Sequence, residues 1–348
     1  TWLASALITT APVPLSSSAC ASATASELLP LAVGPAISAT RGRSGADSER
    51  SSMDFIVTLI AADQLSDETV SAVADQLDRA AIQVHHWRWL DKGKAGDFSI
   101  NAHPHEGPRI RAALGDIPEI DIAVQPEATR KKMLLVADMD STMIPVECID
   151  ELADYAGIKP QIAEITERAM QGELDFAEAL AARVALLEGL PETTVEQCLR
   201  ERVTLMPGAR TLIQTMRGWG AECVLVSGGF MHFVGPVSEQ IGFGHGYANR
   251  LEILDGKLTG RVEQPIVDSA FKRRILEEWL ERMDLPRERS LAVGDGANDI
   301  PMIEAAGTGY AYHAKEKARA AADVAIRYGD LTTLLYAQGI ARADWVEA

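Results

Sequence analysis

The chain has 348 residues and carries 50 acidic against 33 basic side chains, a formal net charge of −17. Such an acidic protein lacks the basic surface by which proteins bind nucleic acid, and no stretch reaches the ~18 apolar residues of a membrane-spanning helix. The length suffices for two domains and one sizeable core. The four cysteines show no paired spacing, which is typical of a reducing compartment, so we expect a cytoplasmic protein.

Residues 1–52 form a leader that differs from the rest of the chain. It is rich in Ala, Ser and Thr and contains no lysine, so we expect it to be of low complexity, to build no core and to be disordered. A transit peptide is one interpretation of this Ser-rich, acid-poor composition. We favour the other, in which Met53 is the true start and the leader is upstream sequence that was conceptually translated, because the folded pattern begins at Met53.

Residues 53–130 predict a small α+β domain. The patterns predict strands and helices, the first helix with a serine cap, in this order: strand 55–60, helix 66–81, strand 83–89, helix 109–114 and strand 120–124. The order resembles that of ACT-like domains, and no motif identifies a ligand. His103 and His105 flank a proline without a third ligand nearby, which favours a solvated turn over a metal site.

The segment 131–140 carries the most informative motif. Residues 131–137 read as a short apolar strand of a parallel sheet, where an aspartate would place a charge in a dry core. We therefore expect the strand to end at Asp138, at the carboxyl edge where α/β sheets bind ligands. Because side chains alternate along a strand, Asp138 and Asp140 can face the same bound group. A carboxylate cap on a following turn is the structural alternative.

Residues 145–206 show only helical patterns and predict a helical cap. Acidic residues predominate in this segment, so Arg183 stands out on or beside an apolar stretch. Its planar guanidinium is suited to binding a carboxylate. An arginine that passes the core with its charged end in water is an alternative of about equal weight. Cys148 lacks a plausible histidine partner and is interpreted as packing.

Two further apolar strands are predicted at 222–226 and 290–293. The first leads into Ser227 and Gly228, and the second leads into the acidic run 294–299. Three apolar strands that end in small or acidic residues indicate a parallel sheet with a site along its carboxyl edge.

A helix is predicted between these two strands, at 270–283, with Lys272 in its first turn. Cations favour the last turn of a helix, so Lys272 opposes the helix dipole unless an anion holds it there. A solvated surface lysine is the alternative.

Together these segments resemble the haloacid dehalogenase superfamily, whose motifs are an Asp-x-Asp strand end, a Ser/Thr strand end, a lysine and a Gly-Asp-x-x-x-Asp acidic end. The resemblance narrows to the phosphoserine phosphatases, on four segments: 138–147, 166–190, 226–230 and 294–303. It covers residues 131–348, with the cap at about 145–206. It implies an α/β fold with a Rossmann-like parallel sheet and a helical cap insertion, preceded by the small α+β domain at 53–130.

The resemblance also implies roles for individual residues. Asp138 would be the nucleophile that forms an aspartyl-phosphate, and Asp140 would be the general acid and then the general base. Mg²⁺ would be the cofactor, held by Asp138, Asp295 and the backbone carbonyl of Asp140, with Asp299 in support. The phosphate would be bound by Ser227, the Gly228 amide and Lys272, with Asn298 nearby.

Four cap residues complete the implied site. Arg183 would bind the substrate carboxylate and Glu147 its amine. Met170 and Phe176 match apolar lid residues, for which ordinary core packing is an alternative of almost equal weight.

The function that we expect is Mg²⁺-dependent hydrolysis of O-phosphoserine to serine and phosphate, the last step of serine biosynthesis. A phosphotransferase, or a phosphatase for another small ester such as phosphohomoserine, is an alternative within the fold. An amino-acid-sensing regulatory protein is the alternative that is not an enzyme. We expect a small-molecule substrate and no nucleic-acid or membrane partner, and a homodimer stays open.

Overall fold

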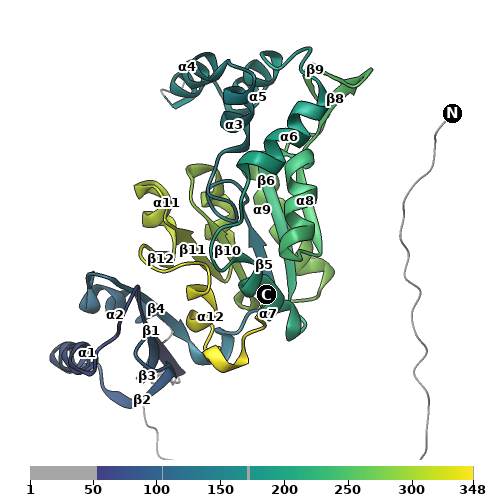
Figure 1. Ribbon diagram of the computed structural model, residues 1–348. Helices are drawn as coiled ribbons and strands as arrows, with labels where there is room; N and C mark the ends of the chain where they lie inside the picture. Colours follow the sequence, from purple (N-terminus) through teal and green to yellow (C-terminus); the bar gives the residue numbers. More distant parts are fainter. Residues whose placement is uncertain (1–52, 104, 171–172, 348) are drawn as a thin grey trace, which may run out of the picture. The chain divides into compact units, whose positions relative to one another are not determined.

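The computed structural model describes residues 53–103, 105–170 and 173–347 (Figure 1). The prediction of a disordered leader falls on residues 1–52, outside the described part. No helix among the described residues is long and apolar enough to cross a membrane.

The first sheet is antiparallel and has the strand order β2-β3-β1-β4. It is built by β1 (Met53–Ala61), α1 (Asp67–Arg79), β2 (Val84–Asp91), β3 (Ala95–Ala102), α2 (Gly107–Leu114) and β4 (Ile120–Pro126). This βαββαβ order is that of ferredoxin-like folds. Ser66 caps α1 as expected, accepting a hydrogen bond from the Thr69 N–H at 3.0 Å. Strand β3 was not predicted, because Gly96, Asp97 and Ser99 interrupt its apolar pattern.

The second sheet has six parallel strands in the order β12-β11-β10-β5-β6-β7. Its strands are β5 (Leu134–Ala137), β6 (Glu222–Phe230), β7 (His245–Asn249), β10 (Ser290–Gly294), β11 (Thr308–Tyr312) and β12 (Val324–Ile326). The predicted α/β fold class is therefore confirmed. Two predicted boundaries are wrong. The strand expected at 131–137 begins at Leu134, and the strand expected at 222–226 continues to Phe230 because it pairs with β7 after an irregularity.

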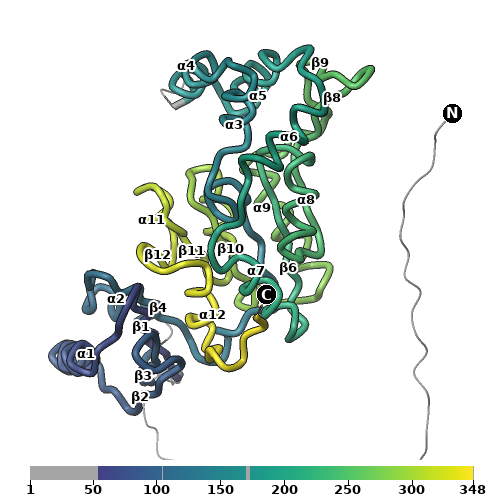
Figure 2. Tube along the Cα trace, viewed as in Figure 1, coloured from purple at the N-terminus to yellow at the C-terminus, as the bar shows by residue number. Residues whose placement is uncertain are grey.

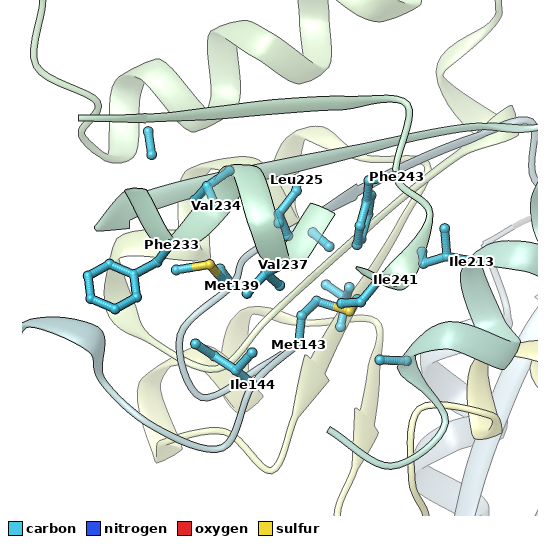
Figure 3. Close-up of a cluster of buried hydrophobic side chains, with 14 of the residues drawn as sticks. Met139, Met143, Ile144, Ile213, Leu225, Phe233, Val234, Val237, Ile241 and Phe243 are labelled. Atoms are coloured by element: carbon cyan, nitrogen blue, oxygen red, sulfur yellow. The ribbon is translucent and has the colours of Figure 1, made fainter. Parts of the chain in front are cut away.

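Alternate residues of the central strands pack on opposite faces of this sheet. Leu135 and Ala137 of β5 belong to a core with α7 (Ala209–Gly218), α8 (Met231–Ile241) and α12 (Thr333–Ala337). Leu134 and Val136 pack instead with α9 (Ser269–Arg282) and α10 (Ile300–Ala305). The loop after β5 is anchored in the first core, where Met139, Met143 and Ile144 lie with side chains of α8 (Figure 3).

The segment between β5 and β6 forms the cap. Figure 2 follows the chain from β5 through the cap helices and back to α7 and β6. The helices are α3 (Cys148–Tyr155), α4 (Lys159–Met170), α5 (Phe176–Ala185) and α6 (Glu192–Arg202). The hairpin of β8 (Leu251–Leu254) and β9 (Lys257–Val262) packs on α5, and α11 (Glu316–Ala321) precedes β12. Among the described residues of 145–206, helices are joined by turns and short loops, as the periodicity predicted.

Buried polar contacts join the two sheets. The Asp121 carboxylate on β4 accepts hydrogen bonds from the Arg327 and Gly329 N–H groups at 2.7 and 2.8 Å. The Gln125 side chain donates to the Ala337 carbonyl at 2.9 Å. These contacts tie the antiparallel sheet to the C-terminal strand and helix of the parallel sheet.

Candidate active site

Asp138 and Lys272 form a buried ion pair at the carboxyl end of β5. Asp138 follows the strand directly, and its N–H donates to the Val293 carbonyl of β10 at 3.0 Å. Lys272 Nζ lies 2.6 Å from Asp138 Oδ1 and 2.7 Å from Asp299 Oδ1. All three side chains are almost fully buried. Two anions therefore hold the lysine against the dipole of α9, and the alternative of a solvated lysine is wrong.

The charge of Lys272 is fixed by its neighbours. Burial alone would lower the pKa of this ammonium group, but the carboxylates of Asp138 and Asp299 outweigh that effect and raise it. Lys272 therefore stays protonated, and its single positive charge faces the carboxylates of both Asp138 and Asp299.

Three carboxylates could hold a metal ion beside this pair. Oxygens of Asp138, Asp295 and Asp299 lie within 4.8 Å of one another. Asp299 Oδ2 already accepts the Gly296 N–H at 3.0 Å and the Asp295 N–H at 3.2 Å, so this residue also orders the loop after β10. Burial, Asp299 and Glu147 raise the pKa of Asp295 to about 6, and a cation would relieve this repulsion. Hard oxygen donors of this kind fit Mg²⁺.

Asp140 lines the same cavity as Asp138, and Met139 between them in the sequence is buried. Its Oδ1 atom is buried without a hydrogen-bond partner among the described residues. Burial and the charge of Glu147 raise its pKa to about 7, while the Cys148 thiol acts in the opposite direction. A carboxyl group with this pKa can both donate and accept a proton near neutral pH, as a general acid and base must.

Strand β6 brings Ser227 and Gly228 to the wall of the same cavity. The Ser227 hydroxyl is buried and accepts the Gly229 N–H at 2.9 Å. Asn249 fixes this segment, since its side-chain amide donates to the Gly228 carbonyl at 2.8 Å and its Oδ1 accepts the Val267 N–H at 2.8 Å. The same buried asparagine thus connects β6 to the segment that leads into α9.

The cap contributes charges to the opposite side of the cavity. Arg183 on α5 is half-buried, and its Nε donates to the Ala179 carbonyl at 3.2 Å. Burial lowers the pKa of this guanidinium, while the charges of Asp150 and Glu147 oppose that shift. Phe176 lies close to the strand end, because a Cβ added at Gly228 would come within 3.2 Å of its ring. Met170 ends α4, and its side chain lies outside the described residues.

A single cavity of about 480 Å³ brings most of the predicted residues together. It is lined by Asp138, Asp140, Glu147, Phe176, Arg183, Ser227, Gly228, Asp295 and Asn298. Lys272 and Asp299 do not line it and lie behind Asp138 instead.

Comparisons with known proteins agree with this geometry. The family model described as haloacid dehalogenase-like hydrolase matches residues 135–304. A phosphoserine phosphatase of Archaeoglobus fulgidus is 44% identical over 243 residues, which are 68% of this chain and 70% of that protein. The chain belongs to the phosphoserine phosphatase family.

Two further relatives of the family show how much of the chain is shared. Phosphoserine phosphatase SerB2 of Mycobacterium tuberculosis is 46% identical over 65% of this chain, and the match spans only 55% of the mycobacterial protein. The solved structure of a probable phosphoserine phosphatase from Vibrio cholerae has a TM-score of 0.66 at 35% identity and covers 84% of this chain and 88% of that one. The likeness therefore extends beyond the parallel sheet.

Three residues in or beside the site, Asp150, Lys315 and Asn249, were not predicted from the sequence. Asp150 and Lys315 line the cavity, and the charge of Lys315 opposes the rise in the pKa of Asp295. Neither residue stands out in the sequence, because both lie in ordinary helical or loop surroundings. The only sequence feature that marks Asn249 as a site residue is an amide side chain at the end of a strand, and this is a weak signal.

Proposed function

We propose that this protein hydrolyses O-phosphoserine to serine and phosphate. One observation carries the proposal: the cavity is lined by the buried Asp138, which Lys272 contacts from behind, and by a guanidinium and a carboxylate from the cap. Phosphoserine carries a phosphate, a carboxylate and an ammonium group, for which these are complementary partners. The names of the relatives support the same substrate.

In the proposed reaction the Asp138 carboxylate attacks phosphorus and the bond to the seryl oxygen breaks, which leaves an aspartyl-phosphate. Asp140 gives its proton to the departing oxygen and then takes one from the water that hydrolyses the acyl-phosphate. Lys272, Ser227 and the Gly228 amide neutralise or bond the phosphate oxygens. The buried, unpartnered Oδ1 of Asp140 supports its role in proton transfer.

Mg²⁺ is the cofactor that we propose for this site. Asp138, Asp295 and the backbone carbonyl of Asp140 would hold it, and Asp299, which is engaged with Lys272 and two N–H groups, would order the loop. When bound, the ion would supply positive charge to the phosphate oxygens.

A test is the release of phosphate and serine from O-phosphoserine by the pure protein, with Mg²⁺ and then with excess EDTA. We expect turnover that EDTA stops and added Mg²⁺ restores, and a clear preference over O-phosphohomoserine. Equal turnover of both esters would leave a phosphatase of unspecified small substrates. A complete lack of phosphatase activity would instead favour the amino-acid-sensing alternative.

A further inference from the structure

The Ser141 hydroxyl lies against the carboxylate that we propose as the ammonium site. Ser141 Oγ donates a hydrogen bond to Glu147 Oε1 at 2.8 Å. Ser141 is half-buried and Glu147 is exposed. Glu147 occupies the N-cap position of α3 without capping it through its side chain. The hydroxyl is therefore the group that restrains this carboxylate within the described part of the chain.

The loop that carries both residues is itself held firmly. The Met139 carbonyl accepts the N–H groups of Met143 and Ile144 at 2.8 and 3.1 Å, and both of these side chains are fully buried (Figure 3). The Ser141 N–H reaches the Val146 carbonyl at 3.4 Å. The loop thus returns Glu147 to the residue that directly follows Asp140.

The backbone of Ser141 adopts a conformation that is unusual for serine. Its φ is +57°, in the left-handed region that favours glycine and asparagine. A serine here costs conformational free energy that glycine would avoid. A side chain kept in such a conformation at the edge of a site points to a role for its hydroxyl.

We propose that Ser141 is a positioning residue, which holds the Glu147 carboxylate in one orientation for the substrate ammonium. The inference rests on the proposed function, because it assigns Glu147 to the amine of phosphoserine. Without the hydroxyl, an exposed glutamate samples several rotamers and loses part of its contact with the ammonium group.

The test compares three esters that differ in the groups that Glu147 and Arg183 would recognise. O-phosphoserine carries both the ammonium and the carboxylate, O-phosphoethanolamine keeps only the ammonium, and 3-phosphonooxypropanoate keeps only the carboxylate. The preference is the ratio of kcat/KM for each ammonium ester to kcat/KM for the ammonium-free ester. In Ser141→Gly we expect this ratio to fall about tenfold, because one hydrogen bond to a charged group is lost. The loss should lie mainly in KM, since no reacting atom is touched.

Two further variants separate the hydroxyl from the backbone. Ser141→Ala, which keeps the Cβ, should show the same change in preference as Ser141→Gly, which relieves the backbone. In a Glu147→Ala background, Ser141→Gly should change the preference no further, because the side chain that the hydroxyl holds is already absent.

Two results would overturn the inference alone. One is an unchanged preference in both Ser141 variants, and the other is an equal loss on all three esters, which would indicate a purely structural role. A wild-type protein that hydrolyses O-phosphoserine no better than 3-phosphonooxypropanoate would overturn the proposed function and this inference with it.

Discussion

Lys272 shares one buried site with the carboxylates of Asp138 and Asp299, at 2.6 and 2.7 Å. Burying three charges is tolerable because each has a hydrogen-bonded partner of opposite sign. Burial and the charge of Asp299 raise the pKa of Asp138, while Lys272 opposes this rise and favours the ionised carboxylate that a nucleophile needs. At the residue scale, catalytic chemistry and local stability therefore depend on the same contacts.

We expect Asp138→Asn to abolish phosphoserine turnover while the protein stays folded. The amide keeps the shape of the side chain and can still accept a hydrogen bond from Lys272, but it is too poor a nucleophile to attack phosphorus. The measurement is single-turnover phosphate release, with circular dichroism as the control for folding. Substantial turnover in the pure variant would remove Asp138 from this role, as would insensitivity of the wild type to beryllium fluoride.

The raised pKa of Asp295 predicts how stability without metal depends on pH. Its pKa rises from 3.8 to about 6 in the folded state. Stabilisation by its proton is complete below pH 3.8, the unfolded value, and is lost as the pH rises to about 6. In EDTA at pH 8, Asp295→Asn should therefore be more stable than the wild type, by about 1 kcal/mol after allowance for solvent screening.

Urea unfolding at pH 5 and pH 8 measures this difference. The advantage of the variant should shrink at pH 5, and Mg²⁺ should stabilise the wild type more than the variant. An Asp295→Asn protein that is less stable than the wild type in EDTA at pH 8 would contradict the proposed repulsion.

At the scale of single elements, the site depends on where strands end and helices begin. Asp268 caps α9, since its carboxylate accepts the Phe271 N–H at 2.8 Å, and Lys272 lies in the first turn of this helix. Ser66 caps α1 in the same way, at 3.0 Å from the Thr69 N–H. The two caps can therefore be compared by mutation, because one lies close to the active-site lysine and the other caps a helix of the N-terminal α+β segment.

Asp268→Ala and Ser66→Ala should each lower the free energy of unfolding by about 1 kcal/mol, the usual value of an N-cap. We expect only Asp268→Ala to lower kcat as well, because fraying of the first turn of α9 displaces Lys272. Denaturant unfolding and steady-state kinetics measure the two effects. Equal kcat values in both variants would show that α9 holds its lysine without the cap.

Some elements could be predicted from the sequence because their patterns are local. The apolar run before Asp138 and the periodicity of α9 suffice to place both elements within a few residues. Strand β3 could not be predicted in this way, because it contains the buried charge of Asp97. The partners that compensate this charge, Arg88, Thr58 and Arg130, lie 9 to 39 residues away in the chain. The position of Lys272 behind Asp138 likewise depends on a contact 134 residues apart in the chain.

At the scale of the whole molecule, buried polar contacts connect the antiparallel sheet to the parallel sheet. Arg130 is 4% exposed, and its guanidinium lies 3.0 Å from the fully buried Asp97 carboxylate of β3. The same group contacts the Tyr336 carbonyl of α12 at 3.5 Å. We propose a domain boundary near residues 130 and 131, which would place this ion pair at the junction of the two domains.

Arg130→Met should destabilise the protein by about 3 kcal/mol, because it leaves much of the buried charge of Asp97 uncompensated. Arg261→Met is the control, because Arg261 forms an ion pair with Glu252 while its side chain is 72% exposed. This substitution should cost less than about 1 kcal/mol. Thermal and urea unfolding measure both values. Similar losses in the two variants would show that the junction does not depend on this ion pair.

The central claim, recognition of phosphoserine by cap charges above a phosphate site, is tested most directly by kcat/KM values of Arg183→Ala and Glu147→Ala on two substrates. For O-phosphoserine each variant should lose on the order of 2–5 kcal/mol of transition-state stabilisation, since one substrate charge is left unpaired. For p-nitrophenyl phosphate, which lacks both groups, the values should stay close to the wild type. A proportional loss on both substrates would contradict the account, because these residues would then only support the cap.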